Sequence, residues 1–209
     1  MKIWKFSTAI LCLVCAGTVV TQAGNRGDLL DPNLVERDVL ESLPELNEEI
    51  AEAIVEGRPY LSAAQLDKVL GEFLDRQQRE TVYARLFRQI NLNDASRSEI
   101  MVIPGMDSRM AHEFEEYRPY TTLEQFRREI GKYVDEDEVA RLERYVFIPM
   151  NLNKASSDDF KTIPGMTSRM VHEFEEYRPY KSIEQFRREI GKYVDEEEVA
   201  RLESYITLE

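Results

Sequence analysis

The stretch IPGMDSRMAHEFEEYRPY at residues 103–120 decides how the chain is built, because it returns at 163–180 as IPGMTSRMVHEFEEYRPY. Residues 91–149 align with 151–209 without a gap, and 41 of the 59 positions are identical. Self-similarity at a fixed period is the sequence signature of repeated structural units. The period therefore predicts two copies of one unit, at 91–150 and 151–209.

A third, diverged copy precedes them over residues 24–90. The tripeptide Arg-Pro-Tyr at 58–60 stands sixty residues before the same tripeptide at 118–120. Near the end of this copy the match shifts, because Ala-Arg-Leu at 84–86 resembles Ala-Arg-Leu at 140–142 at a spacing of 56. We therefore expect the last helix of the first copy to be displaced by four residues relative to the other two.

Each unit reads as four short helices. In the second unit, residue types that cap helix N-termini precede apolar side chains at helical spacing. The capping candidates are Ser96 with Glu99, Asp107 or Ser108, Thr121 or Thr122, and Asp135 with Glu138. Gly131 suits a helix C-terminus, and strand-like alternation is weak throughout. The sequence predicts an all-α chain of tandem four-helix units.

The first 23 residues have the layout of a secretory signal peptide. A positive start and a short apolar run at 9–20 lead to small residues before an expected cut after Ala23. Cleavage there predicts a periplasmic or secreted protein without a membrane span. No lipid anchor is expected at Cys15, because Val14 stands where a lipobox has a small residue.

The mature chain is strongly acidic. Its formal charge is -13 over all 209 residues, and removal of Lys2 and Lys5 leaves -15. Nucleic-acid affinity comes largely from the neutralisation of phosphates by Lys and Arg, so long-range electrostatics disfavour that class of partner. Both cysteines, at positions 12 and 15, lie in the segment expected to be removed, which leaves neither a disulfide nor a cysteine nucleophile.

An ordered set of motifs carries a resemblance to a known family. The second unit contains Asn-Leu-Asn at 91–93, Ala-Ser at 95–96, Ile-Pro-Gly-Met at 103–106, Arg-Pro-Tyr at 118–120 and Glu-Gln-Phe at 124–126. Together they resemble the secreted helix-hairpin-helix proteins of the ComEA type, closely over 91–209 and loosely over 31–90. The resemblance implies paired helix-hairpin-helix motifs that bind double-stranded DNA during DNA uptake. More distantly, the chain is similar to the PsbU-type extrinsic fold, which is exported and structural and does not bind DNA.

The resemblance also implies where DNA would bind. In such hairpins a glycine turn presents backbone N–H groups at a helix N-terminus to a phosphate oxygen. The residues that match this site are Gly105, Met106, Ser108 and Arg109, and Gly165, Met166, Thr167, Ser168 and Arg169.

Two departures from the family pattern weaken that implication. Asp107 and Thr167 stand where the second glycine of the turn belongs, and Asp107 would offer its own carboxylate to the amides. The second hairpin of each unit carries acidic runs, at 135–138 and 195–198, in place of glycine and basic neighbours. Carboxylates at a helix start suit the helix dipole and repel a phosphate.

Sequence support for catalysis or metal binding is weak. His112 and Glu116 lie one helical turn apart, as do His172 and Glu176, but no further histidine completes a ligand set. No Ser-His-acid spacing and no glycine-rich nucleotide loop stand out. We therefore expect no enzymatic activity, cofactor, metal or small-molecule substrate. For the arginine of each Arg-Pro-Tyr tripeptide we expect a structural role on backbone carbonyls or a carboxylate.

Two functional hypotheses remain open from the sequence. The acidic hairpins and the charge of -15 favour an exported, non-catalytic module that binds or scaffolds another exported protein. The alternative is ComEA-like binding of double-stranded DNA through the hairpin amides.

Overall fold

The computed structural model describes residues 29–208, and over this range the chain is mostly α-helical, as the sequence predicts. The expected signal peptide at 1–23, with the cut after Ala23 and with Cys15, lies outside the described residues. Within the described range, no helix is long and apolar enough to cross a membrane.

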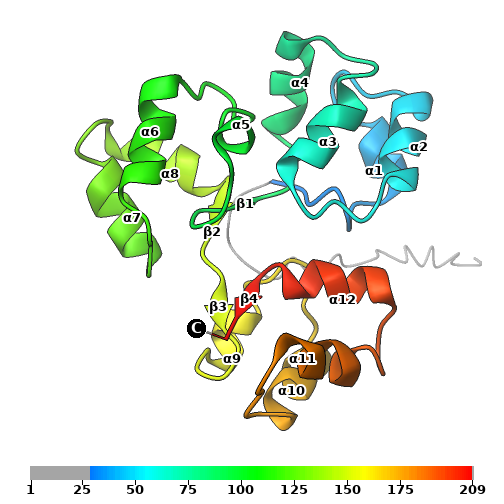
Figure 1. Cartoon of the computed structure of the whole chain (residues 1–209). Coiled ribbons are helices and arrows are strands. Elements are labelled where there is room, and N and C mark those ends of the chain that lie inside the picture. The colour runs from blue at the N-terminus through cyan, green and yellow to red at the C-terminus, as the bar shows by residue number, and fades with distance from the viewer. Residues whose placement is uncertain (1–28, 209) are drawn as a thin grey trace, which may run out of the picture.

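The helices of the described range form three consecutive groups of four (Figure 1). The first group consists of α1 (Arg37–Glu41), α2 (Glu48–Glu56), α3 (Ala63–Leu70) and α4 (Arg76–Tyr83). The second consists of α5 (Arg97–Ile100), α6 (Ser108–Glu116), α7 (Leu123–Ile130) and α8 (Glu136–Glu143). The third consists of α9 (Ser157–Phe160), α10 (Ser168–Glu176), α11 (Ile183–Ile190) and α12 (Glu196–Glu203). Corresponding helices start sixty residues apart in all three groups.

The expected displacement of the last helix in the first group is wrong. The side chain of Asp75 accepts from the backbone N–H of Gln78 at 3.0 Å and so caps α4 at the position of Asp135 in the second group. The Ala-Arg-Leu triplet at 84–86 follows α4 instead of belonging to it, and Leu86 forms a parallel bridge with Leu30. The capping residue Asp75 therefore indicates where this helix starts better than the three-residue match at 84–86 does.

Short parallel strand pairs close the second and third groups. β1 (Ile90–Asn91) pairs with β2 (Val146–Phe147), and β3 (Met150–Asn151) pairs with β4 (Ile206–Thr207). Each pair joins the residues before a group to the residues after it. These strands could not be predicted from the sequence, because two residues are too short to show an alternating pattern.

The side chain of Asn93, from the Asn-Leu-Asn motif, binds the backbone of Tyr120, from the Arg-Pro-Tyr motif. Asn93 Nδ2 donates to the carbonyl of Tyr120 at 2.9 Å, and Asn93 Oδ1 accepts from the N–H of Tyr120 at 2.7 Å. Asn33 and Asn153 make the same two contacts in the first and third groups. These bonds fix the loop before α7 against the start of the group, so the two motifs are structural partners.

The arginines of the Arg-Pro-Tyr motifs hold backbone carbonyls, as expected. Arg118 donates to the carbonyls of Leu92 at 2.5 Å and Ala95 at 2.7 Å. Arg58 and Arg178 make the corresponding pairs of bonds in the other groups. A guanidinium group has several donors in a fixed geometry, so one side chain can satisfy two carbonyls of a tight loop.

Two apolar clusters form the interior. One runs through the first and second groups, and the other fills the third group and includes Phe147 from β2. Phe114 packs edge-on against Phe126 with the ring centroids 5.2 Å apart, and Phe174 packs against Phe186 at 5.1 Å. Isolated helices of eight or nine residues are marginal in water, so this packing supplies most of their stability.

Candidate functional site

The two glycine corners predicted from the repeated stretch adopt the same backbone conformation. Gly105 and Gly165 both have φ of +73°, a region that residues with a side chain rarely adopt. Met106 and Met166 follow them and are buried. Their side chains therefore anchor each corner in the interior, and only the backbone of the corner is available to the outside.

One helix amide beyond each corner has a side-chain acceptor within the chain. Asp107 Oδ1 accepts from the N–H of Met110 at 2.8 Å, and Thr167 Oγ1 accepts from the N–H of Met170 at 3.2 Å. The prediction that Asp107 offers its carboxylate to these amides is confirmed. A phosphate oxygen that bound this amide would have to displace the capping side chain.

The predicted cationic residues of the corners lie against tyrosines of the next hairpin. The guanidinium carbon of Arg109 is 6.0 Å from the centre of the Tyr133 ring, and that of Arg169 is 5.7 Å from the centre of the Tyr193 ring. Such placement over an aromatic face is attractive. Ser108 and Ser168 are exposed in the first turns of α6 and α10, next to the arginines.

The acidic hairpins are tied to the corners through an arginine. Arg141 Nη1 donates to the carbonyl of Pro104 at 2.8 Å, and the same guanidinium binds both carboxylate oxygens of Glu138 at 2.6 and 2.7 Å. Arg201, Pro164 and Glu198 repeat this arrangement in the third group. The last acidic residue of each run is thus paired, while Asp135 caps α8.

The two corners differ in what surrounds them. A methyl group placed on Gly165 would lie 2.9 Å from Cδ1 of Leu34, which belongs to the first group. On Gly105 the nearest atom to such a methyl group would be Nη2 of Arg141, at 3.5 Å. The Gly165 corner is therefore in contact with Leu34, which precedes α1.

Arg88 joins the first group to the third, and the sequence analysis missed it. The side chain is fully buried and donates to the carbonyl of Tyr60 at 3.0 Å, to Ser204 Oγ at 2.6 Å and to the Tyr205 hydroxyl. Its guanidinium carbon also lies 4.5 Å from the centre of the Tyr205 ring. The Tyr205 hydroxyl in turn donates to Asp31 Oδ2 at 3.3 Å, which links the buried cation to a carboxylate.

One signal in the sequence could have identified Arg88. Ile148 and Leu208 occupy the equivalent positions of the other two copies, so an arginine replaces an apolar residue in the segment Leu-Phe-Arg-Gln-Ile at 86–90. Charged residues are seldom fully buried unless paired. An arginine in an apolar run therefore indicates a buried partner, although it does not say which one.

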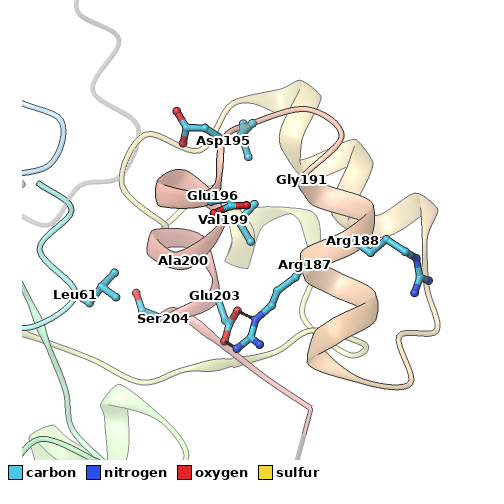
Figure 2. A pocket seen from close by; sticks show the side chains of 11 residues that line it. Leu61, Arg187, Arg188, Gly191, Asp195, Glu196, Val199, Ala200, Glu203 and Ser204 are labelled. Atoms are coloured by element: carbon cyan, nitrogen blue, oxygen red, sulfur yellow. Dashed lines mark hydrogen bonds and ion pairs between the residues drawn. The ribbon is translucent and has the colours of Figure 1, made fainter.

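A groove lies between the last two helices of the third group (Figure 2). It encloses about 1030 Å³, and Leu61 of the first group stands at one end of it, beside Ser204. Arg187 and Glu203 form a two-pronged ion pair along its wall, with distances of 2.6 Å. The remaining lining residues are Arg188, Gly191, Val194, Asp195, Glu196, Val199 and Ala200.

The second group carries the same groove between α7 and α8, with a volume of about 750 Å³. Nine lining positions are shared with the third group, and all nine hold identical residues. The lining residues are Glu124, Arg127, Arg128, Gly131, Val134, Asp135, Glu136, Val139, Ala140 and Glu143. No residue of another group lines this copy within the described range.

The histidines lie on exposed helix surface. His172 Nε2 is 3.5 Å from Glu176 Oε2, one helical turn away. Among residues 29–208, no group of three or more His, Cys, Asp or Glu side chains is placed to hold a metal ion.

Comparison with known proteins identifies no relative that could indicate the function of this chain. No protein-family model matches the chain, and neither a curated protein nor a solved structure matches it.

Proposed function

We propose that the chain is an exported, non-catalytic module that binds or scaffolds another exported protein, built from three tandem helix-hairpin-helix units at 24–90, 91–150 and 151–209. The observation that carries the proposal is the capping of both glycine corners from within. Asp107 and Thr167 each accept from one first-turn amide of the following helix, and a phosphate at that amide would compete with them. A corner capped in this way serves as a tight connection between helices.

Charge and packing support the same conclusion. The mature chain has a formal charge of -15 after removal of Lys2 and Lys5 from the total of -13. Long-range repulsion between this negative chain and a nucleic acid disfavours their association. Leu34 also packs on the Gly165 corner, which limits the approach of a large ligand there.

Binding of double-stranded DNA is the second candidate, and one observation favours it. The Gly105 corner is not covered by another group, and Arg109 is exposed in the first turn of α6, next to it. A phosphate docked at this corner would meet a positive helix end and a nearby guanidinium.

A titration separates the two candidates. The mature chain, from Gly24 onward, is titrated with labelled duplex DNA at about 50 mM and about 200 mM salt, because phosphate binding weakens steeply as salt rises. We expect no binding at either salt concentration.

The variants Arg109→Glu and Arg169→Glu are measured beside the wild-type chain. Tight binding to the wild type that weakens with salt and disappears in either variant would overturn the protein-binding proposal in favour of DNA. Binding that neither salt nor these substitutions change would place any DNA contact outside the two corners.

A further inference from the structure

The ten tyrosines of the chain all lie within the described residues, and they fall into two classes. Six of them are no more than 3% exposed and belong to the apolar interior. The four that are partly exposed are Tyr117, Tyr133, Tyr177 and Tyr193. An oxidant that approaches the folded chain from solvent therefore reaches these four phenols and not the other six.

The four partly exposed tyrosines form two pairs that are joined through their hydroxyl groups. Tyr117 Oη lies 2.8 Å from Tyr133 Oη in the second group, and Tyr177 Oη lies 2.8 Å from Tyr193 Oη in the third. The ring centroids of Tyr117 and Tyr133 are 6.4 Å apart, with 48° between the ring planes. Phenols couple at the ring carbons next to the hydroxyl, so this hydrogen bond holds together the edges at which the two rings react.

A cation lies against each ring of both pairs. Lys132 Nζ is 4.8 Å from the centre of the Tyr117 ring, and Arg109 lies against Tyr133. The third group repeats the arrangement with Lys192 at 4.9 Å from the Tyr177 ring and Arg169 against Tyr193. Attraction between a cation and an aromatic face restrains the ring. Each pair therefore keeps its geometry although its members are partly exposed.

We propose that one-electron oxidation joins Tyr117 to Tyr133, and Tyr177 to Tyr193, through a carbon–carbon bond between their ortho positions. The co-reactant is hydrogen peroxide, acting through a haem peroxidase. Each phenol gives up one electron and its hydroxyl proton, the two phenoxyl radicals couple, and the ring hydrogens at the new bond move to the oxygens. Two hydrogen atoms are lost for each bridge, and one peroxide is reduced to two waters.

Each bridge connects two parts of one group. Tyr117 and Tyr177 end α6 and α10, whereas Tyr133 and Tyr193 lie between the last two helices, 16 positions further along the chain. Residues 29–208 contain no cysteine, so no disulfide connects these parts. A covalent link that closes a loop reduces the conformational entropy of the unfolded chain. The bridge thus supplies the cross-link that disulfides provide in other small domains.

Oxidation of the mature chain, from Gly24 onward, tests the proposal. The chain is treated at low micromolar concentration with a haem peroxidase and one equivalent of hydrogen peroxide for each expected bridge. We expect a monomeric product that has the blue fluorescence of dityrosine and a mass lower by two hydrogen atoms for each bridge. Digestion and mass spectrometry should locate the linked peptides at Tyr117–Tyr133 and Tyr177–Tyr193.

Phenylalanine variants show whether the pairs are the site. Tyr133→Phe should halve the fluorescence of the monomer, and addition of Tyr193→Phe should abolish it. Phe73 occupies the same position in the first group, so these variants should keep the fold, which circular dichroism checks. Tyr120→Phe is the matched control, because Tyr120 is buried three residues from Tyr117 and its loss should leave the yield unchanged.

The same oxidation in urea separates the folded geometry from general reactivity, because all ten tyrosines are then exposed. Bridges should spread over many pairs under this condition. The proposal is overturned if the folded monomer forms no dityrosine, if the double variant still forms it, or if folded and unfolded chains give the same linked peptides. None of these outcomes depends on whether the chain binds a protein or DNA.

Discussion

At the residue scale, the corner between the first two helices of each group shows the backbone strain that a side chain causes at a positive φ. Gly105 and Gly165 take φ of +73° without strain, whereas Glu45 occupies the same corner of the first group with φ of +66°. For residues with a Cβ, the left-handed region costs roughly 1–2 kcal/mol. Glu45 recovers part of this cost by accepting a hydrogen bond from Gln78 Nε2 at 2.9 Å.

The substitution Glu45→Gly should stabilise the protein. Relief of the left-handed strain exceeds the extra conformational entropy that glycine gives the unfolded chain, so we expect a gain of up to about 1 kcal/mol in the free energy of unfolding. Urea denaturation followed by circular dichroism measures it. Gly105→Ala should show the opposite sign, because a methyl group there has space, 3.5 Å from Arg141, but an unfavourable φ. A loss of stability in Glu45→Gly would show that its bond to Gln78 outweighs the strain.

At the element scale, each group is assembled from helices that are capped locally and connected by side chains from elsewhere. Asp107, Thr122 and Asp135 could be predicted as caps, because a cap and the amide that it binds lie three residues apart. Glu99 could not be assigned correctly on this basis. It was expected to complete a capping box with Ser96, but its Oε1 accepts from the N–H of Ala63 at 3.0 Å, at the start of α3.

The contrast between the caps and Glu99 explains how much the sequence revealed. Helix type, helix order and the Asp107 cap depend on neighbours in sequence, so the periodic pattern predicted them. The contacts of Glu99 with α3, of Leu34 with Gly165 and of Arg88 with Tyr205 join residues that lie 36, 131 and 117 positions apart. The local pattern does not distinguish Glu99 and Leu34 from solvent-exposed side chains, and for Arg88 the apolar run around it indicates burial without naming the partner.

Loss of the Asp107 cap should weaken α6 and leave its neighbours unchanged. Asp107→Ala removes the acceptor for the N–H of Met110, and we expect a loss of about 1 kcal/mol in the free energy of unfolding. Asp107→Asn keeps an oxygen acceptor at the same place, and asparagine and aspartate are similar caps, so it should be close to wild type. Chemical denaturation of the wild type and the two variants measures these differences in the free energy of unfolding. Equal stability of the alanine and asparagine variants would mean that the cap contributes nothing.

The contact between Glu99 and α3 should make stability depend on pH. Burial raises the pKa of Glu99 above its ordinary value of 4.5, so the folded chain holds this proton more tightly than the unfolded chain. The ionised side chain therefore lowers stability above the folded-state pKa, and this penalty disappears as the pH falls below the unfolded value. Glu99→Gln keeps an acceptor for Ala63 and should be more stable than wild type at pH 7.

Denaturation of wild type and Glu99→Gln across the range from about pH 4 to pH 7 tests this expectation, since shared titrating groups cancel in the difference. The advantage of the variant should shrink as the pH falls. Asp159→Asn is the matched control, because Asp159 stands at the equivalent position of α9, is exposed and bonds to Ser156 in its own capping box. A constant difference across the range would show that ionisation of Glu99 carries no penalty.

At the scale of the whole molecule, three similar groups are held together by unlike contacts. The first and second groups share one apolar cluster, while the third has its own, to which β2 contributes Phe147. Polar contacts of Arg88 then connect the two clusters. Duplication supplied two nearly identical groups, but Ser204, which accepts a hydrogen bond from Arg88, corresponds to Arg144 in the second group.

Removal of the Arg88 side chain should uncouple the third group from the other two. Arg88→Ala leaves the carbonyl of Tyr60 and the hydroxyl groups of Ser204 and Tyr205 without this donor, and each buried polar group left without a partner costs about 1–3 kcal/mol. Because Arg88 supplies the hydrogen bonds between Tyr60 of the first group and Ser204 and Tyr205 of the third, calorimetry should show two unfolding transitions where the wild type shows one. Arg85→Ala is the control, since Arg85 is exposed three residues away and the change removes the same charge from the chain. A single transition in Arg88→Ala, shifted to lower temperature as a whole, would mean that contacts other than those of Arg88 couple the third group to the first.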